Sequence, residues 1–108
     1  MIKVKVFKHK DDRYSGFSCL GHAGYADSGE DIVCSGVSAL VITIVNAIDA
    51  LAGEQAMVDT DEESGLIALE FVHTPGHDAA LLMDTLVLGI SMMAESYSDY
   101  IQFEIEEV

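Results

Sequence analysis

The sequence has few of the residues that cross-link or interrupt a chain: two cysteines, one proline and no tryptophan among 108 residues. Two cysteines are too few for a disulfide-rich scaffold. A hydrophobic content of 50% with a single proline excludes a collagen-like or disordered chain. The length suits one hydrophobic core, and the chain shows no repeat or linker, so we predict a single domain over residues 1–108.

Positive charge is missing from most of the chain. All five Lys and Arg residues precede Tyr14, whereas 19 Asp and Glu residues bring the formal net charge to −14. Such a charge repels phosphate backbones and anionic lipids, which makes nucleic acid and membranes poor candidates for direct partners. It favours a positively charged partner, although an acidic surface can also serve solubility alone.

Long uninterrupted apolar runs are also missing. The longest apolar stretch, residues 37–51, contains Ser38, Thr43, Asn46 and Asp49, which a bilayer penalises and a core helix tolerates. The N-terminus has no apolar signal-peptide segment. We therefore expect a cytoplasmic protein with no transmembrane segment and no structural disulfide.

Hydrophobic periodicity predicts five strands and two helices. Alternation with a period of two predicts strands at residues 2–7, 14–21, 55–59, 66–72 and 101–106. Apolar residues three and four apart predict helices from Ser28 to Gly53 and from Thr74, as N-cap, to about Tyr97. The order ββαββαβ predicts an α+β domain in which both helices pack on one mostly antiparallel sheet.

The residues best suited to chemistry flank a glycine-rich segment, residues 24–30, which we expect to be a loop. Cys34 follows it in the first turns of the predicted helix, where unpaired backbone N–H groups and the helix dipole favour a thiolate. His22 precedes it, and a neutral imidazole within reach could act as the base and later protonate a leaving amine. The pair indicates nucleophilic catalysis, although a lone cysteine is more often a small core residue.

Two further residues could support this pair. Asp31 could orient the imidazole, as the third group does in Cys–His systems, but it also fits a helix-start motif with Ser28. Ser38 follows Cys34 by one helical turn, where it could hydrogen-bond the thiol or simply mark the edge of the apolar face.

A zinc site is the main chemical alternative, because Cys19, His22 and Cys34 are all possible ligands. Residues three apart on a strand point to opposite faces, and no fourth ligand is evident. We therefore interpret Cys19 as a core residue and expect no metal or other cofactor. His73 and His77 could reach a shared cleft only if the two helices start on the same side. The chain has no glycine-rich phosphate loop, serine nucleophile elbow or HExxH motif.

The flanks of the loop resemble a known family. The run from Gly21 reads GHAGYA and the run from Gly29 reads GEDIVCS. Both are similar to the paired motifs of the ribosomal-processing cysteine protease Prp family, and length and element order extend the resemblance over essentially the whole chain. The resemblance implies a cytosolic protease that removes the N-terminal extension of a basic large-subunit ribosomal protein, the twenty-seventh of the L series, which permits ribosome assembly.

The same resemblance implies roles for individual residues. Cys34 matches the family's nucleophile and His22 its general base and acid, with Asp31 and Ser38 as supporting residues. It also implies an apolar pocket beside Cys34 and a homodimer, in agreement with an apolar arc on the first helix that is wider than one sheet face requires. The pair Ser35-Gly36 after the nucleophile departs from the two small residues, such as alanines, that other members often have there, and Gly36 lowers helix propensity relative to alanine.

Two alternatives remain open from the sequence. The first is a non-catalytic acidic dimer that binds a basic ribosomal protein, which needs the charge but no reactive thiolate. The second is a redox-sensing protein in which Cys34 forms a reversible oxidised state.

Overall fold

The computed structural model describes residues 1–21 and 28–108, with the side chains of residues 28–31 left out. Along this part of the chain the elements are β1 (Ile2–Lys8), β2 (Tyr14–Leu20), α1 (Ser28–Ala50), β3 (Ala56–Asp61), β4 (Leu66–Phe71), α2 (His77–Ser96) and β5 (Ile101–Glu107). The order ββαββαβ confirms the predicted α+β class.

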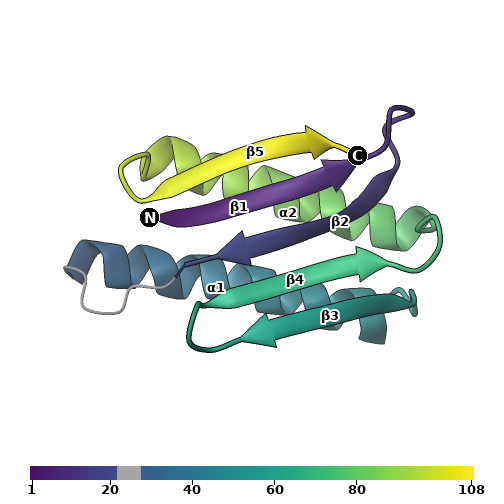
Figure 1. Ribbon diagram of the computed structural model, residues 1–108, viewed down its shortest axis with the longest axis horizontal. Helices are drawn as coiled ribbons and strands as arrows, with labels where there is room; N and C mark the ends of the chain where they lie inside the picture. The colour runs from purple at the N-terminus through teal and green to yellow at the C-terminus, as the bar shows by residue number, and fades with distance from the viewer. Residues whose placement is uncertain (22–27) are drawn as a thin grey trace.

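The strands form one sheet in the order β3-β4-β2-β1-β5. The β1–β2, β2–β4 and β3–β4 pairs are antiparallel, whereas β5 runs parallel to β1, with Ile101 beside Ile2. Both helices lie on the same face of this sheet, and its other face is open (Figure 1). The sheet is therefore mostly antiparallel and two-layered with the helices, as predicted.

The core lies between the sheet and the two helices. Alternate residues of β1 point toward the helices, so Ile2, Val4 and Val6 are buried while Lys3 is exposed. Each helix contributes one stripe with a spacing of three and four; the buried residues are Val33, Val37, Val41, Ile44 and Ile48 on α1 and Ala79, Met83, Leu86 and Ile90 on α2.

The two helices run antiparallel. A Cβ added at Gly36, early in α1, would lie 3.1 Å from the side chain of Met93, late in α2, and one added at Gly89 would meet Leu40. The start of α1 is therefore level with the end of α2 (Figure 1). This arrangement places the starts of the two helices at opposite ends of the molecule.

The predicted start of the second helix was wrong by two residues. The N-cap is Gly76, not Thr74, and the helix begins at His77. The Thr74 hydroxyl instead accepts a hydrogen bond from Arg13 Nη1 at 3.0 Å, and the Glu54 carboxylate accepts one from the Gly76 N–H at 2.7 Å. Arg13 and Glu54, both distant in sequence, thus bond the Thr74 hydroxyl and the Gly76 N–H, the two groups that an N-cap at Thr74 would have paired with each other.

Both helices are long and apolar enough, by length and composition alone, to cross a membrane. Core helices of folded domains pass the same test, and here each helix buries one stripe against the sheet. Several large apolar side chains nevertheless remain exposed on the outer faces of the helices, among them Ile32, Leu81, Leu88 and Met92.

Candidate active site

Cys34 lies in the second turn of α1, six residues after the helix begins at Ser28. Its side chain is partly buried and packs against the edge of the hydrophobic core. The unpaired N–H groups of the first turn, at residues 28–31, lie ~4.5–9 Å away along the axis at 1.5 Å per residue, and the dipole effect weakens beyond that turn. Activation of this thiol therefore depends mainly on a neighbouring base.

Cys19 faces α1 from strand β2 and has a different environment. It is 4% exposed and belongs to the core, as predicted. Burial, with a smaller contribution from nearby Cys34, raises the pKa of the Cys19 thiol to about 11. Both cysteines are free thiols. The Cys19 thiol therefore stays protonated at neutral pH. Cys34 is only partly buried and is the more accessible of the two thiols.

The structure places only part of the predicted constellation. Ser38 follows Cys34 by one turn of α1 and is partly exposed beside it. The predicted base His22 lies outside the described residues, as does the side chain of Asp31, whose backbone belongs to α1. The loop expected at residues 24–30 also falls mostly outside them, although its last three residues belong to α1.

A hollow of about 450 Å³ begins where β2 ends, between α1 and the β3–β4 hairpin. Gly21, the last described residue before His22, lines it together with Ser38. Its other lining residues are apolar along the walls and acidic at one end; they are Ile42, Val45, Asn46, Val58, Thr60, Asp61, Glu62, Gly65, Leu66 and Ile67. The hollow thus starts one helical turn from Cys34, beside the point at which the chain leads into the predicted catalytic loop.

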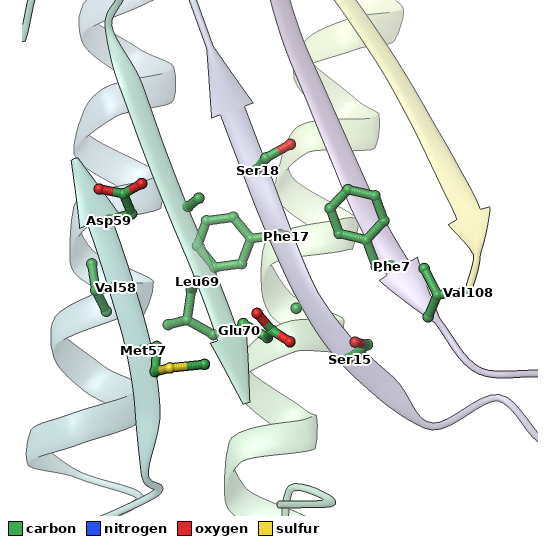
Figure 2. Close-up of a pocket in the computed structure, with 12 residues that line it drawn as sticks. Phe7, Ser15, Phe17, Ser18, Met57, Val58, Asp59, Leu69, Glu70 and Val108 are labelled. Carbon is green, nitrogen blue, oxygen red and sulfur yellow. The ribbon is translucent and has the colours of Figure 1, made fainter. Parts of the chain in front are cut away.

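A larger hollow, about 520 Å³, lies on the open face of the sheet. Figure 2 shows Phe7 and Met57 on either side of it, with Ser18 between them. Gly16, which has no side chain, and Ala68, whose side chain is one methyl group, are among its lining residues. Because the sheet separates this hollow from α1, we do not assign it to the Cys34 thiol.

The other histidines of the chain lie away from Cys34. His73 and His77 are exposed near the start of α2, and the antiparallel helices put that start at the end of the molecule opposite Cys34. Among the side chains that the structure describes, at residues 1–21 and 32–108, His, Cys, Asp and Glu form no group of three that could hold a metal ion. The zinc alternative would in addition require His22, which lies outside that part.

The hollow beside α1 has no counterpart among the patterns of the sequence. Val58 and Thr60 alternate on an acidic strand, a pattern that predicts the strand but not what lies against it. In the sequence, Ile42 lies within the apolar stretch of residues 37–51 and Asn46 interrupts that stretch, and neither observation assigns them to a site. Position along α1 relative to Cys34 is the one signal that could have linked them to the site.

Comparison with known proteins agrees with the motifs. The family model of the cysteine protease Prp matches residues 1–102. The ribosomal processing cysteine protease Prp of Bacillus subtilis is 31% identical over 103 residues, which is 92% of each chain. Its counterpart from Staphylococcus aureus is 29% identical over 102 residues, covering 94% of this chain and 96% of the relative.

Solved structures show the same fold. A crystal structure of the ribosomal processing protease Prp from S. aureus with a substrate peptide has a TM-score of 0.91 at 27% identity and covers 98% of this chain and all of that one. A second structure of that protease carries a covalently linked product peptide, with a TM-score of 0.88 at 28% identity over 98% of this chain and all of that one. With a family model that spans nearly the whole sequence and a fold that agrees, this chain belongs to the Prp family of cysteine proteases.

Proposed function

We propose that this protein is an endopeptidase that removes the N-terminal extension of a large-subunit ribosomal protein, the twenty-seventh of the L series, and so permits ribosome assembly. The observation that carries the proposal is the partly exposed Cys34 thiol on α1, within the DIVC motif and one turn from an apolar hollow. The curated relatives are named as ribosomal processing proteases, which supports the same substrate class.

In this mechanism the Cys34 thiolate attacks the carbonyl carbon of the cleaved bond. His22 accepts the thiol proton and then donates it to the departing amine, which leaves a thioester that water hydrolyses. Backbone N–H groups near the start of α1 stabilise the oxyanion, while Asp31 and Ser38 act as supporting residues. The covalently linked product peptide in the S. aureus relative supports a covalent mechanism.

The decisive test compares three proteins: the wild type, Cys34→Ala and His22→Ala. Each is incubated with the ribosomal protein that still carries its extension, and the product mass is measured. We expect shortening by the wild type and none by either variant. Cleavage that survives in Cys34→Ala would exclude Cys34 as the nucleophile, and survival in His22→Ala would exclude the base.

A second candidate, an acidic protein that binds the basic ribosomal protein without cutting it, is favoured by the net charge of −14. It predicts a stable complex with all three proteins and no shortening by any of them. The same experiment therefore separates the two functions.

We also propose that the protein acts as a cytoplasmic homodimer, with no direct contact to nucleic acid or membrane. On α2, Leu81, Leu88 and Met92 are seven and four residues apart and therefore form one exposed apolar stripe. A dimer formed through the outer helix faces would cover this stripe. We expect Leu88→Glu to shift the mass in solution, measured by analytical ultracentrifugation, from dimer to monomer; a wild-type monomer would contradict the proposal.

A further inference from the structure

The edge strand β3 has backbone groups that face no other strand. Within the described part of the chain it pairs only with β4, because it ends the sheet. The Val72 N–H donates a hydrogen bond to the Gln55 carbonyl just before β3 begins. In an antiparallel ladder every second residue bonds the partner, so the N–H and C=O groups of Val58 and Thr60 point to the free edge.

A continuous crevice runs along this edge, between β3 and α1. The hollow that begins at Ser38 shares Val45, Asn46 and Val58 with a neighbouring hollow of about 350 Å³ that extends to Gln55. At about 100° per residue, one stripe of α1 leads from the thiol along this crevice. The residues on that stripe are Cys34, Ser38, Val45 and Asp49.

The dimensions match an extended peptide. From Cys34 to Asp49 the helix rises ~22 Å at 1.5 Å per residue. An extended chain covers that length with about six or seven residues. A peptide cut at Cys34 therefore has room for such a segment on one side of the cleaved bond.

The lining of the crevice is acidic and therefore favours a basic peptide. Asp61 and Glu62 lie at the end near Cys34, and Asp49 and Glu54 at the far end. The lining has no Lys or Arg, since none follows Arg13 in the sequence. Strand β3 carries neither the lysine nor the proline that commonly protects an exposed edge. Because its charged side chains are all acidic, β3 repels acidic strands, including a second copy of itself, and attracts basic ones.

We propose that the substrate segment adjoining the cleaved bond adds to β3 as an extra strand and places alternate apolar side chains in the crevice, with Lys or Arg between them. This inference rests on the proposed peptidase function. It adds that β3 and the crevice select the substrate by the residues that flank the cleaved bond. Backbone pairing would supply affinity, and the crevice would select the side chains.

The test uses Thr60→Pro, which removes one outward N–H and leaves the ladder to β4 in place, as proline is tolerated on edge strands. The matched control is Thr60→Val, which keeps that N–H and the branched side chain. Two peptides span the cleaved bond of the ribosomal protein: a long one with seven residues on each side and a short one with two. For each protein kcat/KM is measured with both peptides.

We expect Thr60→Pro to lower kcat/KM for the long peptide about tenfold, the weight of one or two lost hydrogen bonds, with little change for the short one. Thr60→Val should match the wild type with both peptides. Equal effects of Thr60→Pro on the two peptides, or no effect on either, would overturn the inference while leaving the peptidase function intact.

A binding experiment judges the crevice even if no peptide is cut, an outcome that would refute the peptidase function itself. Cys34→Ala labelled with ¹⁵N is titrated with a dodecapeptide of alternating valine and lysine, and with valine and glutamate as the control. We expect the basic peptide alone to shift the amide signals of Val58, Thr60 and Asn46. Shifts confined to the open-face hollow around Ser18 and Ala68, or no shifts, would overturn the inference.

Discussion

The environment of a single thiol makes fold stability depend on pH. Burial raises the pKa of Cys19 to about 11 from its ordinary value of 9.0, so the folded state holds this proton more tightly than the unfolded chain does. The stabilisation is complete below pH 9 and is lost as pH rises toward 11. We expect the free energy of unfolding to fall by about 1.4 kcal/mol between neutral pH and pH 10 on account of Cys19.

Urea unfolding at pH 7, 8, 9 and 10 would measure this loss. The control is Cys19→Val, which has a similar volume and no titrating group, and which should show a flatter profile over the same range. Identical pH profiles for the two proteins would show that Cys19 is not the group responsible.

A second residue, Tyr14, connects the sheet to a helix. Its hydroxyl on β2 donates a hydrogen bond to the Asp84 carboxylate on α2, and Lys8 Nζ lies 4.5 Å from the centre of its ring. Burial and this carboxylate hold the pKa of Tyr14 well above its usual value, so the hydroxyl remains a donor. We expect Tyr14→Phe to lower the free energy of unfolding by about 1–2 kcal/mol, because Asp84 loses its donor.

Chemical denaturation of Tyr14→Phe beside Asp84→Asn would check this expectation. The asparagine keeps an oxygen acceptor and should cost less than the loss of the hydroxyl. A Tyr14→Phe protein as stable as the wild type would mean that water replaces the hydrogen bond fully.

At the scale of secondary-structure elements, two glycines differ in what surrounds them. A Cβ at Gly16 of β2 would clash with the backbone oxygen of Leu69 in β4, so the two strands would have to separate. A Cβ at Gly89 of α2 would lie 2.7 Å from the tip of the Leu40 side chain, which can rotate away. Alanine also favours the helix by about 1 kcal/mol relative to glycine.

We therefore expect Gly16→Ala to destabilise the fold by more than about 3 kcal/mol and Gly89→Ala to be within about 1 kcal/mol of the wild type. Thermal unfolding followed by circular dichroism would measure both. A mild effect at Gly16 would mean that β2 and β4 separate at little cost.

At the scale of the whole molecule, charge should affect how substrate arrives. All Lys and Arg residues lie before Tyr14, and the formal net charge is −14. Attraction of a basic ribosomal protein is screened over a Debye length of about 8–10 Å at physiological salt. We expect kcat/KM for that protein to fall several-fold more between 50 and 500 mM salt than kcat/KM for a neutral peptide. Equal salt sensitivity would show that the acidic surface does not steer the substrate.

The periodic segments were predictable because each carries its own signal. Alternation at Ile2, Val4 and Val6 and the helical spacing from Val33 onward depend on neighbours along the chain, and both elements formed as predicted. Gly65, in the turn between β3 and β4, has φ of +69°, a left-handed conformation that glycine adopts without a steric cost. The start of α2 was not predictable, because the groups that decide it, Arg13 and Glu54, are distant in sequence.

The candidate site was predictable only in part. The motif around Cys34 identified the family and the thiol, and the rejection of a zinc site led to the interpretation of Cys19 as a core residue. The crevice could not be inferred, because it exists only where α1 lies beside the edge strand β3. His22 and Asp31 remain predictions of the motif.

The sequence by itself determined the element order, the family, the nucleophile candidate and the one-sided charge, since each depends on local pattern or composition. Only the tertiary structure decided which strand lies at the sheet edge, which thiol is buried, and which face of α1 continues from Cys34 into a crevice. The physical reason is that strand order, burial and concavity arise from contacts between segments far apart in the chain, and local periodicity carries no information about them.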